Sequence, residues 1–305
     1  MVEKTSIIDE INIIQEFINK SNNKPIDEVQ KILEILINYQ NNTMNINKSN
    51  PYYEVIKEMI LLGPKEKFQV LSKVINNNIN KKELPIFIPE NILEMIAEQL
   101  DIIKEEKNLN ILLTNNEPEL LERIYYNMNI DQIDIYSDKI SNKNIYENLY
   151  KVGEIGEVNF VEENIVNTDL ERKYDLIFSP ILFNSKKVDF NNKKVDIKEA
   201  ALQATLQRLK DDGYIFNVVK DGVLNNKQFE DLRERILDNF DLLSIIEFPK
   251  TILYKNRAVN TSLLIIKNSK EKNDKVFLAH LEKDTQAEKN NLLNKFNSYF
   301  KDVVE

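Results

Sequence analysis

One pattern constrains the fold of this chain more than any other feature. From residue 85 onward, short apolar runs alternate with segments that carry apolar residues at helical spacing. Apolar runs of this length that are separated by helices indicate a mostly parallel sheet, covered by helices on both faces. The runs lie at 110–114, 133–137, 158–162, 174–179, 214–219, 242–248, 262–267 and 275–281.

The last two of these runs have no helix between them. Only the polar segment NSKEKND joins them, which favours a hairpin and therefore a reversed strand at the edge of the sheet. The amphipathic segment PENILEMIAEQLDIIKEE is predicted to precede the first strand as a helix, and a further helix is predicted over 285–301. The fold class that follows is α/β, with a doubly wound, mostly parallel sheet of seven to eight strands.

Residues 1–84 show a different pattern, with apolar residues at helical spacing and polar breaks between the segments. The pair Gly63-Pro64 is a strong stop signal for a helix. The polar stretch NNNINKKELP has the composition of a linker. The sequence therefore predicts a helical N-terminal domain at 1–84 and an α/β domain at 85–305.

Composition excludes several classes of function. The chain has no cysteine and one histidine, His280, so disulfides, thiol catalysis and Cys- or multi-His metal sites are excluded. No apolar stretch is long enough for a membrane span, and the first residues lack the features of a signal peptide, so we expect a cytoplasmic protein without membrane partners. The net charge of −9 opposes general binding to phosphates, which leaves only a local basic patch for that purpose.

Four segments in order carry a resemblance to a known family: IFIPENILEMIAEQL, YDLIFSPILF, ALQATLQRLKDDGYIFNVVKDGVLNNKQFEDLRERILDNFDLLSIIEFPKTIL and AVNTSLLIIKNS. They resemble the N6-adenine DNA methyltransferases, in particular the modification subunits of type I restriction systems and their short stand-alone relatives. The resemblance covers about two-thirds of the chain. It implies a Rossmann-like class I methyltransferase fold, S-adenosylmethionine as the cofactor, and DNA as a partner.

The loop that should hold the methyl donor departs from the family pattern. The family places glycines after the first strand, where the backbone approaches the donor closely. Here Thr114, Asn115 and Asn116 occupy the turn, followed by Glu117, and no glycine lies between Gly63 and Gly153. The resemblance assigns these three positions to cofactor binding. It also assigns Asp138, after the second strand, and Glu163 or Asn164, after the third.

The catalytic tetrad of the family is altered as well. In the family, its first side chain and the next carbonyl bind the adenine amino group, and an aromatic ring stacks on the flipped base. The equivalent residues here are Ser179, Pro180, Ile181 and Leu182, followed by Phe183. Isoleucine replaces the second proline, and leucine stands at the aromatic position. Two altered motifs favour a catalytically inactive homologue, a pseudoenzyme whose cofactor is S-adenosylmethionine if it has one at all.

A local basic patch follows the tetrad. The resemblance places Lys186, Lys187, Lys193 and Lys194 near nucleic acid, and a solvated lysine-rich loop is the alternative. Three functions stay open: an accessory protein that binds nucleic acid or a partner methyltransferase or specificity subunit, an active N6-adenine DNA methyltransferase with a divergent donor site, and a Rossmann-like module with another ligand or a structural use.

Overall fold

The protein is described from a computed structural model over residues 7–78, 90–103, 108–137, 142–166, 172–180, 186–250, 259–283 and 285–303. Internal contacts divide the chain into two compact units, which are considered separately. The helical unit comprises 1–84, 121–126 and 140–158, and the sheet unit comprises the rest of the chain. Two later segments, 121–126 and 140–158, thus belong to the helical unit. The predicted domain boundary at residue 85 stays a prediction.

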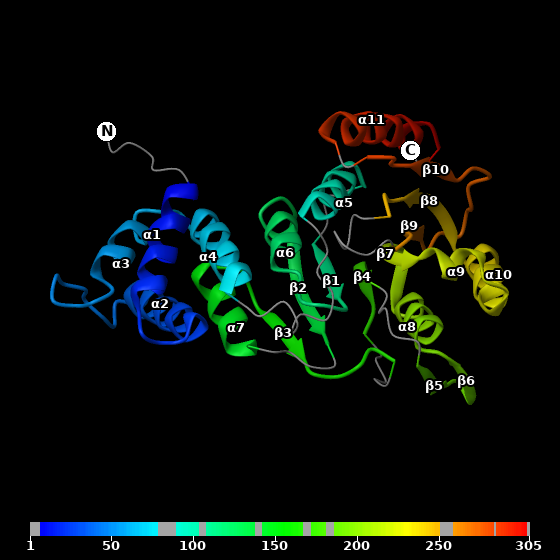
Figure 1. Ribbon diagram of the computed structural model, residues 1–305. Helices are drawn as coiled ribbons and strands as arrows, with labels where there is room; N and C mark the ends of the chain where they lie inside the picture. The colour runs from blue at the N-terminus through cyan, green and yellow to red at the C-terminus, as the bar shows by residue number, and fades with distance from the viewer. Residues whose placement is uncertain are drawn as a thin grey trace. The chain divides into compact units, whose positions relative to one another are not determined.

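The helical unit is built from amphipathic helices, as the spacing of its apolar residues predicts. Apolar residues such as Ile14, Ile32 and Phe68 are fully buried between the helices, where burying each large side chain stabilises the unit by about 1.5–3 kcal/mol. Its helices are α1 (Ile7–Lys20), α2 (Pro25–Gln40), α3 (Tyr53–Met59), α4 (Pro64–Asn78) and α7 (Lys143–Val152) (Figure 1).

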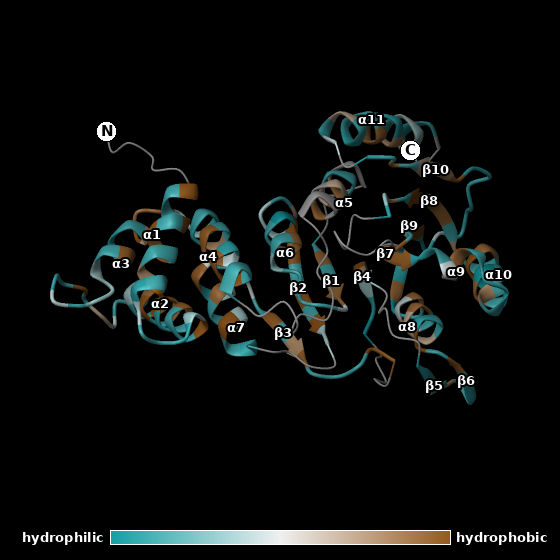
Figure 2. Cartoon of the chain, viewed as in Figure 1, coloured by the Kyte–Doolittle hydropathy of each residue, from teal (hydrophilic) through white to brown (hydrophobic). Residues whose placement is uncertain are grey.

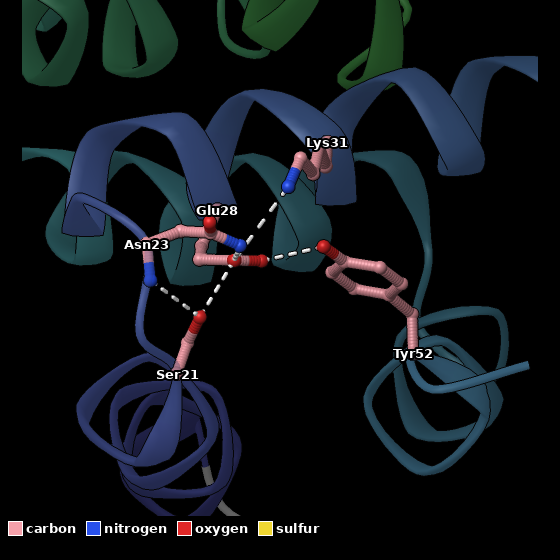
Figure 3. A network of polar contacts seen from close by, with 5 residues as sticks. All are labelled: Ser21, Asn23, Glu28, Lys31 and Tyr52. Carbon is pink, nitrogen blue, oxygen red and sulfur yellow. Dashed lines mark hydrogen bonds and ion pairs between the residues drawn. The ribbon is translucent and has the colours of Figure 1, made fainter.

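A buried carboxylate joins three segments of the helical unit (Figure 3). Glu28 of α2 accepts hydrogen bonds from the hydroxyl of Ser21 (2.7 Å), the amide of Asn23 and the hydroxyl of Tyr52 (2.5 Å), and Lys31 lies 3.7 Å away. Burial raises the pKa of this carboxyl, but the three donors and the lysine outweigh burial and lower the pKa to about 2. Glu28 is therefore an ionised, structural group.

The sheet unit contains an eight-stranded sheet with the order β10-β8-β9-β7-β4-β1-β2-β3. Figure 2 shows hydrophobic residues along its strands, as the apolar runs predict. The predicted fold class is confirmed. The strands are β1 (Leu109–Leu113), β2 (Ile130–Tyr136), β3 (Val158–Val161), β4 (Tyr174–Pro180), β7 (Leu209–Lys220), β8 (Asp241–Glu247), β9 (Thr261–Lys267) and β10 (Phe277–His280).

The predicted hairpin between the last two strands is wrong. The reversed strand is β9, which lies inside the sheet and not at its edge, and which pairs antiparallel with both β7 and β8. Strand β10 pairs parallel with β8 and forms the edge. Strand β9 is buried over nearly its whole length. A central position explains this burial, because the strand then has a paired strand on each side, whereas an edge strand has only one.

Helices cover the sheet. One face packs against α8 (Ile197–Leu206), α9 (Asp221–Asn225), η1 (Lys227–Phe229) and α10 (Glu230–Asn239), which share a core cluster with β1, β4, β7 and β9. Helix α11 (Gln286–Val303) packs against β10 and against α5 (Glu90–Ile103), and Figure 1 shows α11 beside α5. Both of these helices were predicted from the spacing of their apolar residues. Helix α6 (Pro118–Tyr125) follows β1.

The lysine-rich segment after β4 forms a small separate hairpin. Strands β5 (Lys187–Phe190) and β6 (Lys193–Asp196) pair antiparallel outside the main sheet (Figure 1). Asn191 and Asn192 join them with positive φ angles of 50° and 62°, as a two-residue type I′ turn requires. Asparagine tolerates this conformation better than other residues with a side chain. The segment is therefore an ordered ribbon.

Candidate functional site

A row of polar residues crosses the carboxyl ends of the central parallel strands. Thr114 directly follows β1, and its hydroxyl donates a 2.9 Å hydrogen bond to the hydroxyl of Ser179 on β4. Ser179 is paired in register with Asn217 on β7. Because side chains alternate along a strand and register partners point to one face, all three face the side covered by α8 and α10. The structure thus joins a predicted donor-loop residue to a predicted tetrad residue.

Asn217 was not predicted as a site residue. Its side chain is fully buried, and in the described part of the chain neither Oδ1 nor Nδ2 has a hydrogen-bond partner. On the β9 side its register partner is the apolar Leu264. The sequence signal was one polar residue inside the apolar run YIFNVV, which is readily taken as a tolerated exception.

The turn after β1 is filled by side chains. Asn115 donates a 2.8 Å hydrogen bond from its amide to the carboxyl of Glu117, and both residues are buried. Burial raises the pKa of Glu117 to about 8, and the nearby Glu119 adds to this rise. The Glu117 carboxyl is therefore neutral at pH 7. Neither Asn115 nor Asn116 has a positive φ, so the turn does not use the left-handed backbone that asparagine allows.

The other predicted donor-binding residues lie apart from this turn in the sequence. Asn164 forms a local turn after β3, with its side-chain oxygen accepting the backbone N–H of Val166 (2.9 Å). Glu163 beside it is exposed. Asp138, predicted for the ribose, and Leu182 and Phe183, predicted for the tetrad, lie outside the described residues.

A different acidic residue is buried on β2. Asp134 accepts hydrogen bonds from Tyr174 (2.6 Å), Arg172 (2.9 Å), Gln132 (2.9 Å) and Asn159 (3.2 Å). These donors come from the start of β4, the residues before it, β2 itself and β3. With both carboxylate oxygens engaged, Asp134 ties neighbouring strands together and has a structural role.

A second polar pair lies one step further along the same face as Asn217. The hydroxyl of Ser262 on β9 donates a 3.0 Å hydrogen bond to Asp221 at the start of α9. Ser262 is the register partner of Val219, two residues after Asn217. Ligands of open α/β sheets bind at the carboxyl ends of the strands. Hydroxyl, amide and carboxylate groups therefore gather where this fold binds ligands.

The four predicted nucleic-acid-binding lysines are all exposed, and the hairpin separates them into two pairs. Lys187 lies opposite Asp196, and Lys194 lies opposite Asp189, so each of these lysines faces an opposite charge across the ladder. Lys193 lies opposite Phe190, and Lys186 precedes the ladder. The pair Lys186 and Lys193 thus has no acidic residue opposite it in this ladder.

Within the described ranges, no three acidic or histidine side chains come together as metal ligands would. The described helices include none with the length and apolar character that crossing a membrane requires.

Comparison with known proteins identifies the same family as the sequence motifs. The family described as N-6 DNA Methylase matches residues 126–301, more than half of the chain. No curated protein matches this chain. The predicted resemblance is confirmed by the family match.

Solved structures show the same fold. A protein from Listeria monocytogenes, assigned as a class I S-adenosylmethionine-dependent methyltransferase, has a TM-score of 0.75 at 14% identity, over 96% of this chain and 98% of that one. The type I restriction-modification methyltransferase subunit of Streptococcus thermophilus has a TM-score of 0.65 at 16% identity, over 95% and 74%. The M protein of the type I restriction enzyme EcoKI has a TM-score of 0.53 at 13% identity, over 90% and 71%.

Proposed function

We propose that this chain, which belongs to the N-6 DNA methylase family, does not transfer methyl groups and acts as an accessory subunit that binds nucleic acid or a partner protein. One observation carries the proposal: the side chains of Asn115 and Glu117 fill the turn where the family's glycines leave room for the methyl donor. The family implies S-adenosylmethionine as cofactor, so the fit of these residues to that molecule decides the question.

The residues in the turn do not fit S-adenosylmethionine as a glycine-rich loop does. Glycines there allow the backbone N–H groups and the helix N-terminus to approach the ligand closely. Here two buried side chains are hydrogen-bonded to each other at that place. If Glu117 were displaced into water, its carboxyl would ionise at pH 7 and bring negative charge close to the carboxylate of the donor.

An active enzyme with a divergent donor site is the second candidate, and one observation favours it. Ser179-Pro180 ends β4 at the carboxyl edge of the sheet, where the family's tetrad lies. Ser179 is engaged by Thr114 of the donor loop. In an active protein, the second lone pair of the Ser179 hydroxyl oxygen would accept a hydrogen bond from an adenine amino group.

Calorimetry with S-adenosylmethionine at millimolar concentration separates the two candidates. We expect no saturable binding, and no transfer of a labelled methyl group to adenine-containing DNA. Micromolar binding would contradict the proposal. Ser179→Ala is the control for any methyl transfer that appears, since activity from this site must fall when the serine hydroxyl is removed.

Nucleic-acid binding is tested on the hairpin with two matched variants that remove the same charge. Lys186→Gln/Lys193→Gln removes the lysines without an acidic residue opposite, and Lys187→Gln/Lys194→Gln removes those that face aspartates. We expect the first variant to lower the slope of log affinity against log salt by about 2, because each phosphate contact contributes about 0.9. The second should lower the slope less. Equal binding by the unaltered protein and both variants would exclude the hairpin as a DNA contact.

A partner methyltransferase or specificity subunit is proposed as the protein partner. This proposal takes its support from the fold shared with a type I restriction-modification methyltransferase subunit and with a chain from a study of complex assembly in a type I restriction-modification system. Co-expression of the tagged chain with type I subunits encoded in the same genome, followed by affinity purification, tests it. A stoichiometric complex is the expected result, and recovery of the chain alone would contradict the proposal.

A further inference from the structure

Exposed apolar side chains gather at one edge of the sheet unit. In the described part of the chain, this unit exposes three large hydrophobic side chains: Leu237 (55%), Val276 (37%) and Leu278 (71%). A single exposed apolar residue is normal on a protein surface and needs no partner. These three residues, however, all belong to helix α10 or to the edge strand β10 and the residue before it, so their grouping points to a common use.

The two faces of β10 have different surroundings. Phe277 packs against Phe296 and Tyr299 of α11, with ring centroids 5.5 Å apart in both pairs. Leu278 follows Phe277 and points to the opposite face, because side chains alternate along a strand. Its register partner on β8 is Ile245, which packs against the core cluster beneath α8 and α10. Since Leu278 is exposed, no described helix covers this face of the edge strand.

Leu237 continues the uncovered face onto α10. Helix α10 contacts β8, and Arg235 donates a 3.1 Å hydrogen bond to Gln203 of α8. Two residues along a helix are about 200° apart, so Leu237 points away from α8. Because α8 contacts β4 and β7, the side away from α8 is the side of β10 in the strand order.

A hydrogen bond joins α10 to the chain that leads into β10. The Nζ atom of Lys272, four residues before Val276, donates a 2.7 Å hydrogen bond to the carbonyl oxygen of Leu237. The exposed apolar residues of the two elements therefore form one surface, the edge patch. It comprises the exposed Leu237, Val276 and Leu278 and the half-buried Leu242 and Ile245.

Acidic residues border the edge patch. Glu230 and Glu234 precede Leu237 by seven and three residues, which places them on the same side of α10, and both are exposed. Glu247 ends β8 beside His280, whose Nδ1 lies 3.1 Å from its carboxylate. The whole chain carries a net charge of −9. Negative charge beside an apolar surface disfavours nucleic acid and a second copy of this chain, and favours a partner with basic residues.

The size of the uncovered face suits a helix. Helices normally cover the strands of a two-sided sheet, and a helix about 10 Å wide spans about two strands, which are about 4.8 Å apart. One more helix beside α10 would therefore cover β10.

We propose that an amphipathic helix of a partner protein docks on the edge patch, with its apolar stripe on Leu237 and Leu278 and with lysines or arginines beside Glu230 and Glu234. This is the helix-on-apolar-surface mode of recognition. The inference rests on the proposed function in one respect, the existence of a protein partner. It adds the surface that the partner contacts and the chemistry that the partner needs.

The probe is a fluorescent synthetic peptide of about 18 residues, or five helical turns, with leucines at i, i+3, i+4 and i+7 and lysines on both flanks. A second peptide has the same residues in scrambled order, so it keeps the charge and loses the apolar stripe. Fluorescence anisotropy with the full chain at low salt measures both affinities. We expect the first peptide to bind about tenfold more tightly than the second.

Leu237→Gln/Leu278→Thr tests the apolar part of the surface. Both side chains are exposed, so the core stays in place, and circular dichroism checks the fold. We expect the affinity for the first peptide to fall about tenfold, because the apolar area that the peptide buries is lost. Leu61→Gln is the matched control, since Leu61 is a comparably exposed leucine (64%) in the helical unit, and it should leave binding unchanged.

Glu230→Gln/Glu234→Gln tests the charge. We expect binding to weaken about fivefold at low salt and the difference to fade at high salt, as for exposed ion pairs. Asp231→Asn/Asp238→Asn removes the same charge from the side of α10 that carries Arg235, four residues after Asp231 and three before Asp238. This second variant should weaken binding less.

Equal binding of the two peptides would overturn the inference, and so would an unchanged affinity in Leu237→Gln/Leu278→Thr. Sedimentation of the unaltered chain and of this variant tests a second copy as the occupant. A dimer that the variant dissociates would also overturn the inference. Binding of S-adenosylmethionine, or recovery of the chain without a type I subunit, would contradict the proposed function and leave peptide binding unchanged, so the two failures are distinguishable.

Discussion

Two buried glutamates, one in each unit, behave in opposite ways. Glu28 of the helical unit is surrounded by three hydrogen-bond donors and a lysine, and its pKa falls to about 2. Glu117 of the donor loop accepts one side-chain hydrogen bond, from Asn115, and lies near Glu119, and its pKa rises to about 8. Burial is common to both, so the surrounding groups decide the charge.

The difference lies in the hydrogen-bond donors that surround each carboxyl group. Glu28 is held as an anion because the helical unit supplies the donors that an anion requires (Figure 3). Among the described residues, the turn after β1 supplies one side-chain amide donor, so it holds Glu117 as a neutral acid. Three substitutions test this contrast, from the largest expected effect to the smallest.

Glu28→Ala should destabilise the helical unit by about 4 kcal/mol, since it leaves three donors without their shared acceptor. Denaturation with urea, followed by circular dichroism, measures the loss. The folded pKa lies below the unfolded value of 4.5, so the stabilisation is present above pH 4.5 and is lost as the pH falls toward 2. A loss that is unchanged at pH 2 would contradict the assignment of Glu28 as an anion.

Glu117→Gln should have the opposite sign and stabilise the sheet unit. The folded pKa of about 8 lies above the unfolded value of 4.5, so the carboxyl costs no stability below pH 4.5. The cost grows as the pH rises and levels off above pH 8. At pH 7 the variant should be more stable by about 3 kcal/mol, from about 1.36 kcal/mol for each pH unit. Thermal melts at pH 4.5, 7 and 8.5 measure the gap, and a gap independent of pH would refute a neutral Glu117.

Tyr52→Phe removes one of the donors to Glu28 and leaves the other two. We expect a loss of about 1 kcal/mol, typical of one hydrogen bond, and a rise in the pKa of Glu28. Carbon-detected NMR titration of the Glu28 carboxyl measures the pKa. An unchanged pKa would mean that Ser21, Asn23 and Lys31 are enough to keep the carboxylate ionised.

The sequence predicted which segments form strands and helices better than it predicted which strands pair with each other. Each of the apolar runs became a strand, and those of the inner strands β4 and β9 are buried on both faces, as the pattern of a central strand requires. The pattern cannot say which strands pair, so the insertion of β9 between β7 and β8 was missed. The hairpin at Lys187–Asp196 was missed because its lysines were taken for a loop, although Val188, Phe190 and Val195 share one face of the ribbon.

Residues of the candidate site were predicted only where they belong to a motif of the family. Thr114 and Ser179 were identified from separate motifs, and their hydrogen bond was not. Asn217 lies outside both motifs, and only its register with Ser179 shows its place. The state of Glu117 was also hidden, because a pKa depends on three-dimensional burial and on the donors that folding brings near.

The central place of β9 also has a consequence for the order of folding. Strands β7 and β8 precede β9 in the chain, yet they are not neighbours, and Thr261–Lys267 lies between them and pairs with both. During synthesis, β8 therefore leaves the ribosome with no place in the sheet until β9 follows. In that interval an apolar strand has unsatisfied backbone groups, which is the state in which chaperones bind and aggregation begins.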